Sequence, residues 1–447
     1  MVTDSPNKTD KTDKFIAEAF ARRVEPIARL SDSADAVAEA CLAMARAFRS
    51  GGRLLVFGTG TAATDAQHVS VEFVHPVIVG KRALPAFSLA ADAATVTGLA
   101  GSAGLEAVFA HQLRVLGRPA DIALGISGDG ECPAVARALV TARELGMTTV
   151  ALVGGTSGTS KSRGSAEDSR TNNSGREIAK RALADHCLTV ESDDPRVVKE
   201  GHVTLYHLLW ELTHAFLEQP HAADPAQSPE PAGAGITGLY PFLYSGEASV
   251  TELTAEVAAS ARSKIAEIVD LRREIGVAEA QNLAACAQVL ARGFADGATL
   301  LAFGNGGSSS DAQDVVHTFL DPGPGATARP ALCLTNDTAV LTALSNDIGF
   351  DVVFARQLQA VGRPGDIAVA VSTSGGSANV LAALAAARKS GMTTVGFAGY
   401  DGGRMAEPGL VDHLFAVPSA SVHRIQEIQT TLYHVLWELV QAELARA

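Results

Sequence analysis

The sequence has few cysteines, few charged residues and no long apolar run. Its five cysteines are scattered along 447 residues without a CxxC pair, which argues against a disulfide framework or a cysteine zinc site and favours a reducing, cytoplasmic setting. No uninterrupted run of about 18 apolar residues occurs, so no membrane-spanning helix is expected. The first residues are polar and lack the apolar stretch of a secretory signal.

The charge balance restricts the partners. Charged residues make up 19% of the chain and the net charge is −13, so a nucleic-acid partner is not expected. A phosphorylated ligand would therefore need a local electropositive feature. Apolar residues make up 47%, enough for sizeable cores, and the length suits two domains of roughly 200 residues.

An internal repeat determines the domain organisation. The segment VFAHQLRVLGRPADIALGIS from Val108 reappears as VFARQLQAVGRPGDIAVAVS from Val353, and TLYHLLWEL from Thr204 reappears as TLYHVLWEL from Thr431. The second separation is about 18 residues shorter, which matches a Ser/Gly/Thr-rich insertion at about 155–176 in repeat 1. We predict one domain over 15–218, a Pro/Ala-rich linker over 219–245, and a second domain over 246–447.

Both repeats alternate short apolar runs with alanine-rich helical segments. RLLVFG, IALGIS and TTVALVG in repeat 1 correspond to TLLAFG, IAVAVS and TTVGFAG in repeat 2. Nearly unbroken apolar strands separated by helices are typical of a parallel sheet covered on both faces. The predicted fold is α/β, with two tandem domains that each hold a parallel five-stranded sheet. Ligands of such sheets bind at the carboxyl ends of the strands.

The segment after the IAVAVS strand is rich in hydroxyls and glycine. It contains Ser372, Thr373, Ser374 and Ser377 directly before a predicted helix. Hydroxyls, flexible glycines and the N–H groups of a helix N-terminus together form an anion site without lysine. An ordinary helix cap is the alternative, but it needs fewer hydroxyls. The matching loop of repeat 1, from Ser127 to Pro133, carries Asp129 and Glu131, which would repel a phosphate.

The glycine turn after the first apolar run is richer in polar residues in repeat 2, whereas the helix after the turn carries a His/Glu pair only in repeat 1. Repeat 2 reads Asn305-Gly306-Gly307-Ser308, whereas repeat 1 lacks this asparagine and these serines. Repeat 1 places His68 and Glu72 four residues apart, so they share one helical face. Repeat 2 has Asp314 and Thr318 there. A His/Glu pair at this spacing suits a metal or a base with its partner, although a surface hydrogen bond is the more common reading.

The last helix of each repeat carries further candidates. Gln426 and His434 are close enough around a helix to face one site, and His207 repeats His434 in the first copy. A packing histidine is the alternative for both. Repeat 1 has Lys199 in the glutamine position.

Together, GNGGSSSDAQ, TND, FARQLQAVGRPGD, STSGGSANV, GMTTV and HRIQEI…YH resemble the sedoheptulose-7-phosphate (phosphoheptose) isomerases of the SIS, or sugar isomerase, domain superfamily. The resemblance implies a substrate-binding set on repeat 2: Asn305, Gly306, Ser308, Asp337, Ser372, Thr373, Ser374, Ser377 and Gln426. It also implies a Zn²⁺ held by His68, Glu72, Gln426 and His434.

The resemblance further implies aldose–ketose isomerisation of sedoheptulose 7-phosphate through an enediolate, at a composite site that draws on both repeats. Glu72 is expected to be the base and His434 the acid, with His207 as an alternative to His434. Because family members form tetramers, a homodimer of this chain would be a pseudo-tetramer of SIS domains. The second, pseudo-symmetric site, with the Ser127 loop and Asp314 and Thr318, is expected to be inactive.

Two alternatives remain open. One is isomerisation of another long-chain, eight-carbon ketose phosphate. The other is a non-catalytic sugar-phosphate-binding SIS regulator, which would bind ligand without turnover and would usually carry a DNA-binding domain. No helix-turn-helix segment or basic stretch is evident in the sequence.

Overall fold

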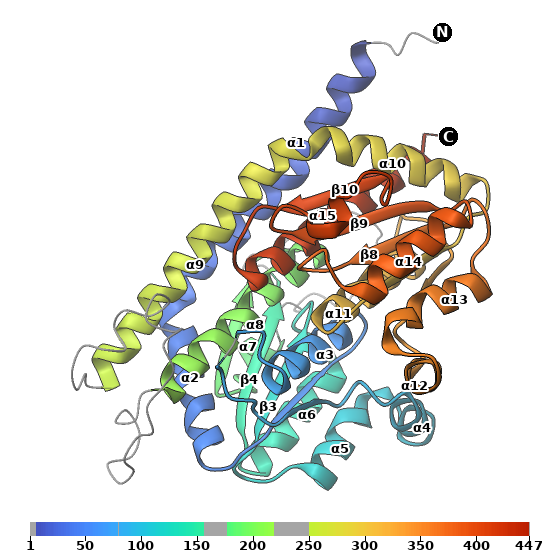
Figure 1. Ribbon diagram of the computed structural model, residues 1–447. Helices are drawn as coiled ribbons and strands as arrows, with labels where there is room; N and C mark the ends of the chain where they lie inside the picture. Colours follow the sequence, from blue (N-terminus) through green and yellow to red (C-terminus); the bar gives the residue numbers. More distant parts are fainter. Residues whose placement is uncertain (1–5, 79, 156–176, 219–249, 447) are drawn as a thin grey trace, which may run out of the picture. The chain divides into compact units, whose positions relative to one another are not determined.

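Figure 1 shows the computed structural model of the protein, which describes residues 6–78, 80–155, 177–218 and 250–446. The predicted insertion, apart from Gly155, and the predicted linker lie outside the described residues. The chain divides into two compact units. Unit 1 comprises Met1–Val24 and Ile268–Ala447, and unit 2 comprises Glu25–Glu267. No helix in the described part of the chain is long and apolar enough to cross a membrane.

Each unit contains a five-stranded sheet, and every strand pairing is parallel. In unit 2 the order is β2-β1-β3-β4-β5, and in unit 1 it is β10-β9-β8-β6-β7. The predicted fold class is therefore confirmed. The strands are β1 (Leu54–Gly58), β2 (Ala86–Ser88), β3 (Ile122–Ser127), β4 (Thr148–Gly154), β5 (His186–Val190), β6 (Leu300–Gly304), β7 (Ala331–Cys333), β8 (Ile367–Val371), β9 (Thr393–Gly399) and β10 (His413–Val417).

The strand order of each sheet brings the two predicted loops side by side. After β1 the chain forms β2 on one side and then returns to form β3 on the other side of β1. The ends of neighbouring strands therefore align, with Gly58 opposite Ile126 in unit 2 and Gly304 opposite Val371 in unit 1. Such a reversal of strand order is where open α/β sheets bind ligands. The glycine turn and the polar loop follow these paired ends.

Helices cover both faces of each sheet, as the buried apolar strands require. In unit 2, side chains of β1, β3 and β4 form one core with α5 and α6, while α2, α3 and α8 pack together on the other side. The helices of unit 2 are α2 (Ala34–Arg49), α3 (Thr61–Val74), α4 (Ala93–Ala103), α5 (Val108–Leu116), α6 (Pro133–Glu144), α7 (Glu177–Lys180) and α8 (Pro195–Leu217). Those of unit 1 are α10 (Ala280–Ala295), α11 (Gly307–Leu320), α12 (Thr338–Asp347), α13 (Val353–Val361), α14 (Ala378–Lys389) and α15 (Val422–Leu444).

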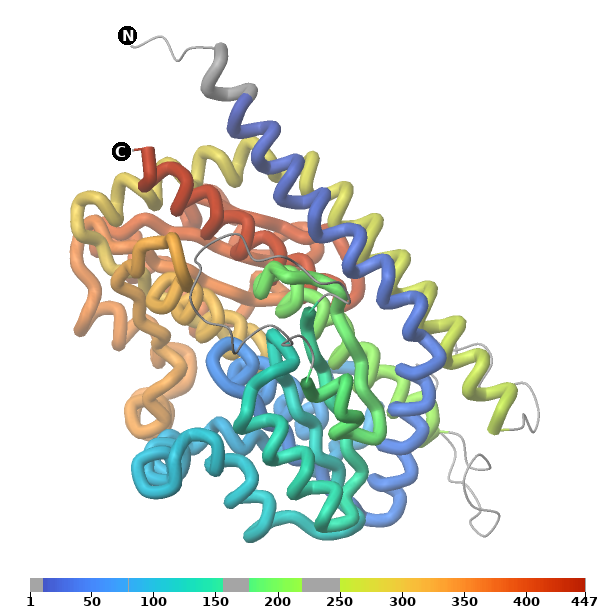
Figure 2. Tube along the Cα trace, turned by 180° about the vertical axis from the view of Figure 1, so that it is seen from behind, coloured from blue at the N-terminus to red at the C-terminus, as the bar shows by residue number. Residues whose placement is uncertain are grey.

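Two long helices, α1 (Pro6–Ala28) and α9 (Val250–Ala278), begin in one unit and end in the other. Most of α1 belongs to unit 1, where Arg23 Nη2 lies 2.7 Å from Glu438 Oε1 of α15 and the blue helix passes the red one in Figure 2. The first part of α9 belongs to unit 2, where Lys264 Nζ lies 2.6 Å from Glu211 Oε2 of α8. Each repeat thus supplies its first helix to the unit that holds the sheet of the other repeat.

Candidate functional site

The predicted phosphate loop of unit 1 joins the end of β8 to the N-terminus of α14. Gly375 has φ +61°, and a Cβ there would lie 2.1 Å from the Gly402 carbonyl oxygen, so only glycine fits this turn. Ser377 occupies the N-cap position of α14, yet its side chain makes no capping hydrogen bond. Its hydroxyl instead lies 3.5 Å from that of Ser372. Hydroxyls that face each other at a helix N-terminus fit anion binding better than capping.

The glycine turn of unit 1 lies beside this loop and is hydrogen-bonded to the first turn of α14. Asn305 Nδ2 donates to Asn379 Oδ1, and Asn379 Nδ2 donates back to Asn305 Oδ1, both at 2.9 Å. Asn379 is buried in the first turn of α14. Gly306 has φ +56°, and Ser308 is 3% exposed in the first turn of α11. The amide pair was not expected from the sequence, which assigned Asn305 to substrate alone.

Asp337 lies at the start of α12. Its Oδ1 accepts a hydrogen bond from the Val340 amide at 3.0 Å, so it caps that helix. The carboxylate is exposed. A capping role accounts for this residue without a ligand, and its predicted contact with substrate stays a prediction.

The corresponding loop of unit 2 contains a carboxylate side chain, that of Asp129. Asp129 Oδ1 accepts hydrogen bonds from Ser127 Oγ at 3.0 Å and from the Glu131 amide at 2.9 Å. Asp129 stands where repeat 2 has Ser374, whose Oγ accepts from the Gly376 amide at 3.2 Å. The carboxylate therefore uses the amide that the serine uses in unit 1. A second negative group would meet repulsion here.

His68 and Glu72 lie on one face of α3 in unit 2, as their spacing predicts. His68 Nε2 is 3.7 Å from Glu72 Oε1, and the residues are 1% and 2% exposed. The His207 ring of α8 lies edge-on to the His68 ring, with centroids 5.4 Å apart. Trp210 Nε1 donates to the Glu72 carbonyl oxygen at 2.7 Å, so α8 also holds α3 in place. Because both residues are buried, the alternative of a surface hydrogen bond is excluded.

Gln426 and His434 lie on α15 in unit 1 and are buried. His434 Nε2 is 3.4 Å from Asp314 Oδ2, and the Tyr433 hydroxyl donates to the same oxygen at 2.8 Å. Burial, with the charges of Asp314 and Asp311, raises the pKa of Tyr433 well above its ordinary value. Asp314, which the sequence assigned to the inactive second site, is thus the carboxylate partner of His434.

The predicted residues therefore divide between the units. Unit 2 gathers His68, Glu72 and His207, whereas unit 1 holds the phosphate loop, Gln426 and His434. The separation of His68 and Glu72 would allow both to ligate one ion. Within the ranges that the structure describes, however, no group of three or more His, Cys, Asp or Glu side chains is placed to hold a metal. The predicted Zn²⁺ site therefore stays a prediction.

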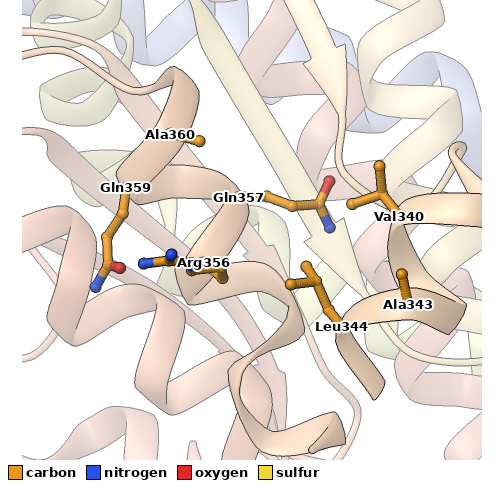
Figure 3. Close-up of a pocket in the computed structure, with 7 residues that line it drawn as sticks. All are labelled: Val340, Ala343, Leu344, Arg356, Gln357, Gln359 and Ala360. Atoms are coloured by element: carbon orange, nitrogen blue, oxygen red, sulfur yellow. The ribbon is translucent and has the colours of Figure 1, made fainter. Parts of the chain in front are cut away.

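A cavity of about 500 Å³ in unit 1 lies between α12 and α13. In Figure 3 the Gln357 side chain extends toward Val340. Gln357 Nε2 donates to the Leu334 and Val353 carbonyls at 3.0 and 3.1 Å, which gives this amide a structural role. None of the predicted site residues lines the cavity, whose walls are Val340, Ala343, Leu344, Arg356, Gln357, Gln359 and Ala360.

Comparison with known families gives the class of this protein. The model of the SIS domain matches twice, at residues 18–154 and 265–399. The chain therefore belongs to the SIS domain family, and it carries two copies of that domain.

Individual relatives are more specific. The chain is 44% identical over 177 residues to a phosphoheptose isomerase of Roseiflexus sp. (strain RS-1), covering 39% of this chain and 89% of the relative. It is 48% identical over 173 residues to a phosphoheptose isomerase of Desulfovibrio desulfuricans, covering 38% and 80%. These relatives therefore match about one repeat.

One solved structure aligns with nearly the whole chain and has a similar fold. The C-terminal domain of glucosamine-fructose-6-phosphate aminotransferase from Francisella tularensis aligns with 95% of this chain and 96% of its own, at a TM-score of 0.52 and 11% identity. At that identity the likeness concerns the fold alone.

Proposed function

We propose that this protein is a sugar-phosphate isomerase that interconverts sedoheptulose 7-phosphate and an aldose heptose 7-phosphate. The observation that carries the proposal is the loop between β8 and α14, whose hydroxyls are held at a helix N-terminus and are not used for capping. Identity above 40% to phosphoheptose isomerases over most of their length supports the choice of substrate.

The phosphate of the substrate would be the anchor. The 12 residues of α14 present their N-terminal amides and partial positive charge to the loop. This local field matters because the net charge of the chain is −13. Binding energy gained at the phosphate positions the far end of the sugar, where the reaction takes place.

Isomerisation requires one proton to move between adjacent carbons. A base removes the proton from the carbon beside the carbonyl, and the electron pair forms an enediol while an acid protonates the carbonyl oxygen. The base then returns the proton to the former carbonyl carbon, and the hydroxyl of the first carbon gives its proton back to the acid as that carbon becomes the new carbonyl. His434 suits the acid, because the buried Asp314 carboxylate 3.4 Å away stabilises its protonated ring. Glu72 is our choice for the base.

The proposal requires groups from both units. We expect Ser374→Ala, in unit 1, and Glu72→Gln, in unit 2, each to lower kcat/KM by about 10²-fold or more. Asp129→Ala is the matched control for the loop change, because Asp129 stands at the position of Ser374 in the other repeat. It should leave turnover near the wild-type rate. Full activity of either Ser374→Ala or Glu72→Gln would refute the proposal.

The decisive measurement is conversion of sedoheptulose 7-phosphate by the purified full-length protein, with and without a chelator, followed by chromatography of the product. Binding without turnover would favour the regulator alternative. Turnover of an eight-carbon ketose phosphate in preference to the heptulose would shift the assigned substrate. Mixing Glu72→Gln protein with Ser374→Ala protein tests whether the groups come from one chain or two, because only sites shared between chains are rescued.

A further inference from the structure

Lys199 of α8 is a buried cation with a complete set of acceptors. Its Nζ lies 2.7 Å from Asp65 Oδ1, 2.8 Å from Thr64 Oγ1 and 3.1 Å from the Thr61 carbonyl oxygen. Lys199 is 6% exposed and Asp65 1% exposed. A lysine ammonium has three N–H bonds, and there is one acceptor for each. The side chain is thus held as an ammonium ion between α3 and α8.

The second repeat has a neutral residue at this point. Gln426 of α15 stands where α8 has Lys199, while Asp311 matches Asp65. Unit 1 joins α11 to α15 through a different contact, 3.4 Å between Asp314 Oδ2 and His434 Nε2. The contact in unit 1 therefore uses a carboxylate three residues after Asp311 on α11 and a side chain eight residues after Gln426 on α15. Repeat 1 instead carries a lysine, whose Nζ lies 2.7 Å from Asp65 Oδ1.

Lysine in place of glutamine changes which oxygen atoms near His68 can bind a cation: the amide oxygen of the glutamine is absent, and the Asp65 carboxylate is paired with Lys199. A glutamine could offer its amide oxygen to a cation and would leave the Asp65 carboxylate available. An ammonium has no lone pair, and it engages that carboxylate directly. His68 Nε2 lies 3.7 Å from Glu72 Oε1 with the His207 ring beside His68, and the described residues gather no group of three or more His, Cys, Asp or Glu side chains placed to hold a metal.

We propose that Lys199 is a built-in cation that replaces a divalent metal ion in unit 2, so that α3 and α8 are held together without one. The ammonium links α8 to the N-terminal part of α3, through Thr61, Thr64 and Asp65. This inference goes beyond the proposed function, because it would hold equally for a protein that only binds sugar phosphates. It also differs from the zinc site predicted from the sequence, and one experiment separates the two.

The test is cobalt binding by the full-length protein after chelator treatment, with Co²⁺ as the probe and visible absorption as the readout. Lys199→Gln should raise the affinity for Co²⁺ at least about tenfold over wild type, because residues beside metal ligands typically alter metal affinity by about 10- to 100-fold. Adding His68→Ala should abolish the gain. Lys199→Arg keeps the charge and is the matched control, which should bind no better than wild type.

Removing the lysine leaves Asp65 buried without its cation, so Lys199→Gln could fold poorly. The double variant Asp65→Asn with Lys199→Gln removes both charges and preserves the shapes, and it should show the same gain through His68. Circular dichroism checks the fold of each variant. The proposal is overturned if wild type already binds one Co²⁺ through His68 as tightly as the variants do, or if neither folded variant gains affinity. Isomerase assays are read separately, so an inactive wild type would count against the proposed function only.

Discussion

The ion pair between Arg23 and Glu438 should be one of the most sensitive positions for the stability of unit 1. Arg23 comes from α1, is fully buried, and donates to Glu438 Oε1 at 2.7 Å and to the Ala19 carbonyl oxygen at 2.6 Å. Arg22 pairs with the other carboxylate oxygen. The change Glu438→Gln keeps the shape of the side chain and removes its charge, so it leaves the Arg23 guanidinium buried beside a neutral group.

The expected loss of unfolding free energy follows from this burial. Arg22 is 39% exposed at its side chain and can turn to water, whereas Arg23 is 0% exposed and cannot. Breaking a buried pair from one side costs about 3–5 kcal/mol, a large part of the roughly 5–15 kcal/mol that stabilises a domain. The exposed pair between Arg404 and Glu407 gives the control, since Glu407→Gln should cost less than about 1 kcal/mol.

Urea unfolding of the full-length protein, followed by circular dichroism and hydrogen exchange, measures the effect. Because the chain has two units, the exchange of α15 amides reports unit 1 separately from the rest. The double variant Arg23→Met with Glu438→Gln should recover part of the loss, because no buried charge is left alone. If Glu438→Gln loses no more stability than Glu407→Gln, the assigned role of α1 in unit 1 is wrong.

Three further predictions concern the loop, the pH response and the assembly. Gly399→Ala would place a Cβ 2.4 Å from Ile425 Cδ1 and 2.6 Å from the Thr373 carbonyl oxygen, so sugar-phosphate binding measured by calorimetry should weaken, while Gly293→Ala, with at least 3.6 Å of space, should not change it. Burial lowers the pKa of His202 to about 4 from 6.5; the unfolded chain therefore binds more protons between these values, and the unfolding free energy should fall by up to about 3 kcal/mol as pH drops through that window. His202→Gln should flatten this dependence in urea titrations, and an unchanged slope would exclude His202 as its source. Light scattering should give twice the chain mass, as expected for a homodimer, and a monomer at working concentration would contradict that expectation.

Much of the fold follows from local pattern. The apolar runs before Gly58 and Gly304 form the expected strands, and the hydroxyl loop from Ser372 follows β8 as predicted. These features depend on residues close together in sequence, so composition and periodicity suffice. The difference between the two loops is also visible in the sequence, because Asp129 stands where repeat 2 has the hydroxyl of Ser374.

The contacts between helices could not be predicted in the same way. His68 and Glu72 share a face by spacing alone, but their neighbour His207 depends on how α3 packs against α8. The link from Asp314 to His434 and that from Lys199 to Asp65 depend on the same packing. The sequence also did not predict that α1 packs mainly in unit 1 and that the first part of α9 packs in unit 2. An amphipathic pattern identifies the buried face of a helix but not the partner that covers it.

The positions of α1 and α9, each in the unit that holds the other repeat's sheet, affect whether the gene can lose one repeat. A fragment that ends before α9 would lack Lys264, the partner of Glu211, and a fragment that begins after α1 would lack Arg23, the partner of Glu438. Deleting either copy therefore damages the one that remains. Two copies that must be inherited together can each lose a serine or a histidine that the other retains, because selection acts on the pair. The helices that complete each unit thus tie the two unlike copies to one gene.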